Sequence, residues 1–151
     1  MTETSHRCLW SRDDLGGHDI PSSAIAYLQS RGLPCRVGNS TIEFGIYDSP
    51  DRCVIGQDFD YPIYIESDGT VWHESGDGEP DPQFMNSSVE HLDKFVTCYL
   101  TWWVGVQDDD RSALQEAIGH TTRSLRDLDP PAFSSERWIW PQIWEDLLAQ
   151  C

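Results

Sequence analysis

The sequence predicts a single α+β domain in which a central antiparallel β-sheet is flanked by helices. Three observations support this prediction. Strand-like segments cluster within residues 41–72, helical segments precede and follow them, and a length of 151 residues suits one domain better than two. We assign residues 21–151 to the domain. Residues 1–20 are expected to form a loosely ordered N-terminal arm, because they show no hydrophobic period and contain Gly16-Gly17.

The first expected helix begins near Pro21. Proline suits the first turn of a helix, and Ile25 and Leu28 follow it at helical spacing. Gly32, with Pro34 just beyond it, indicates where the helix ends.

A period of two then replaces the helical period. The expected strands lie within 41–46, 53–55, 63–65 and 70–72. Asp68-Gly69, between the last two segments, is typical of a tight hairpin turn, because both residues tolerate a positive φ. These signals predict a meander of about three or four antiparallel strands.

Helices follow a loop rich in Gly, Asp and Pro at 75–82. Ser87 and Glu90 fit a capping box, with Asn86 as a competing cap, and an apolar stripe at helical spacing then runs to Trp103. Asp108-Asp109-Asp110 is expected to open a further helix that ends at Asp129-Pro130-Pro131. A Trp-rich helix is expected from about Ser135, bent or restarted at Pro141.

The charge is strongly negative. The chain has 26 Asp and Glu against 10 Lys and Arg, a net charge of −16. Such a chain repels phosphate backbones and anionic lipids, so we expect no nucleic-acid or membrane partner and favour a basic protein partner. Twelve acidic residues lie from Asp48 to Asp93, and only Arg52 opposes them there, a net −11. Solubility alone remains an alternative explanation for this charge.

The cysteines and the N-terminus predict a cytoplasmic protein. The five Cys are scattered without a CxxC pair, and the first residues lack the apolar stretch of a secretory signal. We therefore expect reduced thiols rather than a disulfide framework, with Cys53 and Cys98 buried in the core. No apolar run is long enough to span a bilayer.

Motifs for catalysis and cofactors are absent from the sequence. It contains no phosphate-binding glycine loop and no GxSxG motif. Its His and Cys residues are too dispersed to predict a metal site. Asp58 and Asp60 would share one side of an extended strand and could form a hydrolase-like pair, but a solvated acidic surface is the simpler interpretation. We predict no catalytic residue, no metal and no cofactor.

Several segments together resemble a known family. They are the G-x-D turn at 56–58, the strand and hairpin IYIESDGTV at 63–71, and the F-x-N-S-S sequence at 84–88. Matching features at 28–34 and 128–147 extend the similarity over most of the chain. The pattern resembles the SUKH superfamily and is most similar to its fourth subgroup of bacterial immunity proteins, the SUKH-4 type. One departure is visible, since members often have a Gly-rich stretch where this chain has residues 59–62.

The resemblance implies an α+β fold and a non-catalytic function. Proteins of this type are similar to cytoplasmic antidotes that bind the toxin domain of a polymorphic toxin system and block its active site. Many such toxins are nucleases or deaminases, so the expected partner is a cognate, basic toxin domain. We expect the contact surface on the outgoing strand of the hairpin and the loop after it, where an aromatic anchor stands beside a carboxylate rim. Its residues are Trp72, Glu74, Asp77, Glu79 and Asp81.

Two alternatives remain open at this point. The first is a regulatory or scaffold module of the same fold, which would bind endogenous proteins and give no protection from a toxin. The second is a hydrolase that uses Asp58 and Asp60. The sequence does not indicate the oligomeric state.

Overall fold

The structure is a computed structural model that describes residues 6–37, 40–74, 82–105, 111–136 and 138–149. Their main sheet is an antiparallel meander of five strands in the order β3-β4-β5-β6-β7. The strands are β3 (Ile42–Phe44), β4 (Cys53–Asp58), β5 (Tyr61–Ile65), β6 (Val71–His73) and β7 (Gln83–Asn86). A second, two-stranded sheet pairs β1 (Arg7–Cys8) with β2 (Leu33–Pro34). The α+β prediction is confirmed.

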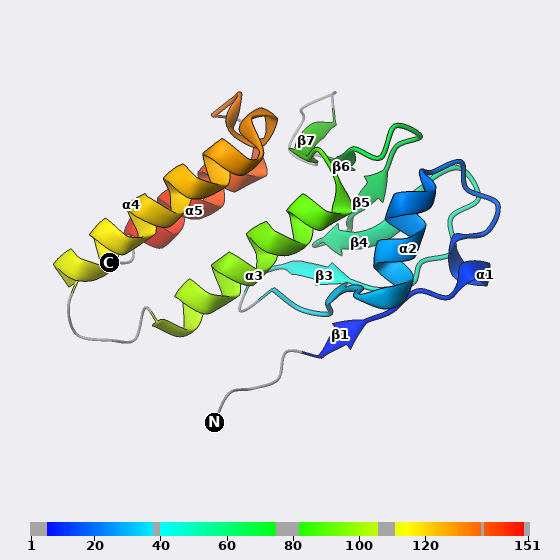
Figure 1. Ribbon diagram of the computed structural model, residues 1–151, viewed down its shortest axis with the longest axis horizontal. Helices are drawn as coiled ribbons and strands as arrows, with labels where there is room; N and C mark the ends of the chain where they lie inside the picture. The colour runs from blue at the N-terminus through cyan, green and yellow to red at the C-terminus, as the bar shows by residue number, and fades with distance from the viewer. Residues whose placement is uncertain (1–5, 38–39, 75–81, 106–110, 137, 150–151) are drawn as a thin grey trace.

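Helices flank the main sheet (Figure 1). In Figure 1, α3 crosses in front of the sheet, α2 lies to one side of it, and α4 and α5 run side by side beyond its other flank. The helical elements are α1 (Arg12–Leu15), α2 (Ser22–Ser30), α3 (Val89–Gly105), α4 (Arg111–Leu128), the 3-10 helix η1 (Pro130–Phe133) and α5 (Ile139–Ala149). In the part of the chain that the structure describes, no helix is long and apolar enough to cross a membrane.

The core lies between the sheet and α3. Ile63, Ile65 and Val71 point to the inner face of the sheet, as the period of two predicts, and all are buried. On α3, Leu92 and Phe95 belong to the same buried cluster. Each such side chain contributes about 1.5–3 kcal/mol by leaving water.

The β5–β6 hairpin turns where Asp68-Gly69 predicts it. Gly69 adopts a φ of 90°, which an L side chain rarely adopts. The Asp68 carboxylate accepts hydrogen bonds from the N–H and the hydroxyl of Thr70, and these bonds lower the pKa of Asp68.

Strand β7 is an addition to the expected meander. Asn86 was expected to cap a helix, but Gln83, Phe84 and Asn86 pair with β6, and α3 begins only at Val89. Ser88 caps α3, because its hydroxyl accepts the N–H of His91 at 3.1 Å. The predicted capping role of Asn86 and Ser87 is therefore wrong.

Asn86 and Ser87 instead bind the buried carboxylate of Asp129. Asp129 Oδ2 accepts the Asn86 side-chain N–H at 3.0 Å and the Ser87 backbone N–H at 2.9 Å, and Oδ1 accepts the Ser87 hydroxyl at 2.5 Å. Asn86 Oδ1 in turn accepts the indole N–H of Trp140 at 2.8 Å. This Asp129 network joins β7, the start of α3, the residue before η1 and α5. Pro141 does not break α5, because it lies in the first turn, where backbone N–H groups need no helical partner.

The N-terminal segment from Arg7 to Leu15 packs against the rest of the domain. Trp10 and Leu15 are buried, and Arg7 donates hydrogen bonds to the carbonyls of Arg31 and Gly32. Arg7 also forms an ion pair of 2.6 Å with Asp93 of α3. These contacts are distant in sequence, so the local hydrophobic pattern of residues 1–20 could not indicate them.

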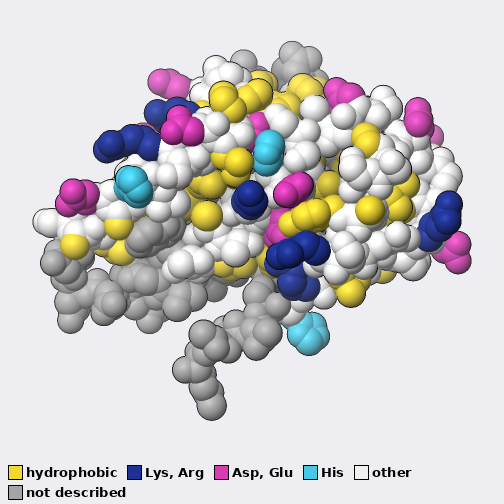
Figure 2. All heavy atoms as spheres, in the orientation of Figure 1, with side chains coloured by type: hydrophobic (Ala, Val, Ile, Leu, Met, Phe, Trp, Pro, Cys, Tyr) yellow, Lys and Arg dark blue, Asp and Glu magenta, His cyan; other side chains and the backbone are white. Residues whose placement is uncertain are grey.

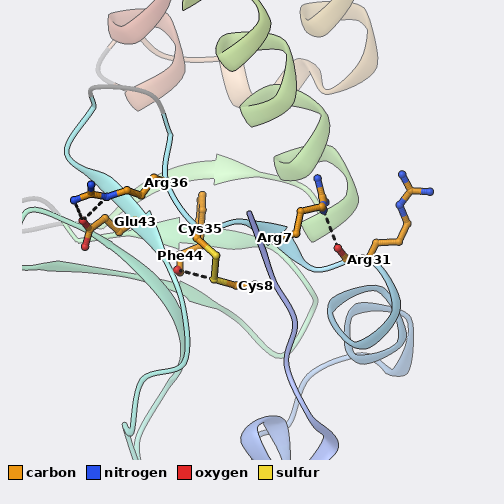
Figure 3. The surroundings of a disulfide bond; sticks show 7 residues. All are labelled: Arg7, Cys8, Arg31, Cys35, Arg36, Glu43 and Phe44. Atoms are coloured by element: carbon orange, nitrogen blue, oxygen red, sulfur yellow. Dashed lines mark hydrogen bonds and ion pairs between the residues drawn. A yellow bond between two sulfur atoms is a disulfide. The ribbon is translucent and has the colours of Figure 1, made fainter. Parts of the chain in front are cut away.

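A disulfide joins Cys8 to Cys35 (Figure 3). The prediction that all cysteines are reduced is wrong for this pair, whose Cα atoms lie 5.3 Å apart because β1 pairs with β2. Cys53 and Cys98 are free thiols, and burial raises the pKa of Cys53 to about 11. Cys53 is buried as predicted, whereas Cys98 is only half-buried. Cys151 lies outside the described residues.

The Asp129 network makes a stability prediction. Asp129→Ala leaves the buried donors of Asn86 and Ser87 without an acceptor, so it should lower the free energy of unfolding by about 3 kcal/mol. Urea denaturation measures the change. Asp127→Ala, an exposed neighbour on α4, is the matched control and should change it by less than about 0.5 kcal/mol. Equal effects of the two variants would contradict the structural role of the network.

The disulfide makes a second prediction. It closes a loop with a sequence separation of 27 residues, so the double variant Cys8→Ser/Cys35→Ser should lose about 2–4 kcal/mol of stability under oxidising conditions. A reductant should destabilise the native chain by a similar amount and leave the double variant unchanged. Cys98→Ser should keep the reductant response. Identical urea midpoints with and without reductant would show that the bond does not form.

Candidate functional site

Trp72 is the middle residue of β6 and points to the opposite face of the sheet from Val71 and His73. Its neighbours in β6, Val71 and His73, are both buried, whereas Trp72 is half-buried. Its ring packs edge-on against Phe84 of β7, with ring centroids 5.4 Å apart, and its indole N–H donates to the Thr70 hydroxyl at 2.8 Å. These two contacts hold the indole in one orientation.

Glu74 follows β6 directly. Its backbone N–H donates to the carbonyl of Pro62 at 3.1 Å, and its carboxylate pairs with Arg52. The Arg52 guanidinium also lies 4.5 Å from the centre of the Tyr64 ring. The hydrogen bond to Glu74 raises the pKa of Arg52. The one arginine of the 48–93 segment is therefore engaged within the protein.

The other expected contact residues cannot be placed. Asp77, Glu79 and Asp81 lie outside the described residues. The chain before and after them is described, and Gln83 pairs with His73, so the segment that contains them leaves and rejoins the sheet at the same end. The structure thus places two of the five expected residues, Trp72 and Glu74, next to each other on the sheet.

The turn between β4 and β5 lies at this same end. Asp58 pairs with Tyr61 across the turn, and Ile63 pairs with His73 on the next strand. We call the surface formed by Asp58, Phe59, Asp60, Tyr61 and Glu74 the acidic sheet end. Sequence reasoning counted Asp58 and Asp60 among the acidic residues and weighed them as a catalytic pair, but it did not include them, Phe59 or Tyr61 in the expected contact surface.

A buried histidine stands at the base of the acidic sheet end. The His73 side chain is only 9% exposed, and neither ring nitrogen has a hydrogen-bond partner among the described residues. Its Nε2 lies 3.5 Å from Oδ2 of Asp58, which also accepts the Thr41 hydroxyl through Oδ1. Burial lowers the pKa of His73, an effect that outweighs the opposing influence of Asp58.

The described residues do not assemble a recognisable catalytic or metal centre. They contain no group of three or more His, Cys, Asp or Glu side chains that could hold a metal ion. Asp60 is exposed in a turn, whereas Asp58 is bound to Thr41, so the two carboxylates do not share an apolar cleft of the kind that tunes a catalytic pKa.

A large cavity lies elsewhere, among the helices. It has a volume of about 610 Å³ and lies among Arg7, Arg31, Asp93, Lys94 and Leu125. Figure 2 shows this helical face, on which basic and acidic side chains meet near the centre. Because cations line this cavity, it is less suited to a basic partner than the acidic sheet end.

The structure thus combines an α+β fold with a sheet end on which acidic and aromatic side chains lie together. A family model described as SUKH-4 immunity protein matches residues 13–146. The chain therefore belongs to the SUKH-4 immunity protein family, and the family resemblance of the sequence is confirmed. No match was found among curated proteins or among solved structures.

The lowered pKa of His73 predicts a pH dependence of stability. Because the folded state disfavours the protonated ring, stability is full above the unfolded pKa of about 6.5 and falls as the pH drops toward the folded value. In the His73→Phe variant the midpoint of thermal unfolding should therefore change less between about pH 7.5 and about pH 5 than it does in the native chain. His120→Gln, at an exposed position, should leave the native slope intact. A slope that survives His73→Phe would assign the effect to another group.

Proposed function

We propose that this chain is a non-catalytic immunity protein that binds and neutralises a basic, nucleic-acid-targeting toxin domain of a bacterial polymorphic toxin system. The family membership supports the immunity function. The charge distribution of the chain is the observation that supports a basic toxin that acts on nucleic acid. Twelve acidic residues from Asp48 to Asp93 face one arginine, and that arginine is already paired with Glu74.

The proposed contact surface comprises Trp72, Glu74, Asp77, Glu79 and Asp81. An enzyme that acts on nucleic acid needs a basic cleft for phosphate groups, and a set of carboxylates can occupy that cleft in their place. Trp72 supplies a rigid aromatic surface, because Phe84 and Thr70 already fix its ring. Long-range attraction raises the association rate, and salt screens it.

The proposed mechanism is occlusion and includes no turnover. The arrangement of Asp58 and Asp60 supports this, because Asp60 is exposed in the turn while Asp58 is held by the Thr41 hydroxyl. The partner is then a protein rather than a nucleic acid or a membrane, since both of these carry the same sign of charge as this chain.

We place this function in the cytoplasm, where a nucleic-acid-targeting toxin would find its substrate. Cytoplasmic thiols are kept reduced, so the Cys8–Cys35 bond would open there. The N-terminal segment would then be held by the remaining contacts, the Arg7–Asp93 ion pair and the hydrogen bond of 2.5 Å from Tyr27 to the same carboxylate. Burial and the Asp93 hydrogen bond raise the pKa of Tyr27 to about 12, so its hydroxyl remains a donor at physiological pH.

Co-expression with the toxin domain encoded beside this gene tests the proposal. The chain should restore growth and form a complex whose affinity falls as salt rises. The triple reversal Asp77→Lys/Glu79→Lys/Asp81→Lys should weaken binding at least tenfold at low salt, mostly through a slower association rate. A reversal of the same net charge away from the sheet, Glu116→Lys/Asp127→Lys/Glu136→Lys, should have a much smaller effect.

The two triple variants separate a local surface from overall charge. Equal losses would mean that net charge alone drives association. No rescue and no complex would remove this toxin as the partner. Growth protection without a complex would contradict occlusion.

A further inference from the structure

The turn between β4 and β5 exposes Phe59 more than any other large apolar side chain that the structure describes. Its side chain is 67% exposed, and Tyr61 beside it is also exposed. Leaving an aromatic ring in water forgoes the free energy of burying it. Exposed aromatic residues bordered by charge are typical of interaction sites.

We propose that Phe59 is the apolar anchor by which this immunity protein holds its toxin, entering an apolar pocket whose rim carries Lys or Arg side chains that pair with Asp58 and Asp60. This inference rests on the proposed function and specifies the chemistry of its partner. It extends the contact surface from Trp72 and Glu74 across the acidic sheet end.

The backbone presents Phe59 in a fixed position. Phe59 has a φ of 54°, the only positive φ of a non-glycine residue in the described chain, and such a conformation costs about 1–2 kcal/mol. The neighbouring strand holds the turn, because the Phe59 N–H donates to the carbonyl of Thr41 at 3.2 Å and the Thr41 hydroxyl donates to Asp58. A ring on a fixed backbone loses little conformational entropy when it is bound.

The acidic neighbours of Phe59 keep their charge available for a partner. The imidazole of His73 points at Asp58 from below, but it is buried, has no hydrogen-bond partner among the described residues and stays neutral at physiological pH. It therefore does not neutralise Asp58. Asp60 is exposed at the tip of the turn. Among the described residues, no Lys or Arg side chain pairs with Asp58 or Asp60. A cation of the partner can therefore bind either carboxylate without displacing an internal one.

The negative charge of the acidic sheet end favours a basic protein as its binding partner. A second copy of this chain carries the same net charge of −16 and would be repelled at an acidic surface. Pro62 joins the two parts of the contact surface, since its carbonyl accepts the N–H of Glu74. A partner that covers Trp72 and Glu74 would thus also reach the turn at Phe59.

The decisive variant is Phe59→Gly. It removes the ring and also accommodates the positive φ, so the urea midpoint should stay the same or rise while toxin affinity falls about 10- to 100-fold, mainly through faster dissociation. A structural role for Phe59 would lower both together. Leu9→Ala is the matched control, because Leu9 is 53% exposed on the N-terminal segment; it should change the affinity less than about twofold.

The probe is a catalytically inactive form of the toxin domain encoded beside this gene, measured by surface plasmon resonance. Asp60→Lys should slow association, and its effect should shrink at high salt. If the native chain binds the toxin and Phe59→Gly binds equally well, the anchor is wrong and the proposed function stands. If the native chain does not bind, both are wrong. If Phe59→Gly dissociates a dimer of the free chain in sedimentation, the ring belongs to a self-interface and the inference is overturned.

Discussion

The buried carboxylate of Asp129 is the constraint on which the arrangement of sheet and helices depends. It is 1% exposed and accepts three hydrogen bonds from Asn86 and Ser87, while Asn86 also accepts the indole N–H of Trp140. A buried charge is tolerated only where such partners surround it. The network therefore fixes the end of β7 and the entry into α3 relative to η1 and α5.

This constraint also determines which part of the sheet is available to a partner. Because α3 starts directly after β7, it folds back across the inner face and contributes Leu92, Phe95 and Val96 to the core. At the opposite end of the strands the chain turns at Phe59, and the helices do not bury this turn. The helices cover one face and one end of the sheet. The acidic sheet end lies at the other end and therefore stays exposed.

The ion pairs of the arginine side chains also affect which charges remain on the surface. Arg52 bridges Tyr64 and Glu74 on the outer face, and Arg7 binds Asp93 at the helical side. Arg52, the one cation of the acidic 48–93 segment, and Arg7 are thus used for internal contacts. The remaining carboxylates give a negative field that would attract a basic protein such as the proposed toxin domain.

Local periodicity predicted most of the fold. The α+β class, the alternating strands and the Asp68-Gly69 hairpin follow from patterns within a few residues. Three features depend on partners far away in sequence and could not be predicted in this way. Strand β7 needs its pairing with β6, the N-terminal segment needs Arg31 and Asp93, and the disulfide needs the pairing of β1 with β2.

The expected contact residues Trp72 and Glu74 followed from a hairpin signal and an acidic loop, and their role in binding stays a prediction. In the structure Trp72 lies in β6 and Glu74 follows that strand directly. The contribution of Phe59 depends on the exposure and backbone angle of one turn, which composition does not reveal. Asp129 looked like a helix stop, because its partners lie more than forty positions earlier in the chain.

Hydrogen–deuterium exchange of the free chain and of the chain bound to its toxin domain tests the central claim most directly, because it maps the covered surface without a substitution. The account predicts slower exchange at 57–62 and 71–83, with α4 unchanged. Slower exchange confined to α2, α3 and α4 around the cavity near Arg31 and Lys94, with the sheet end unchanged, would contradict it.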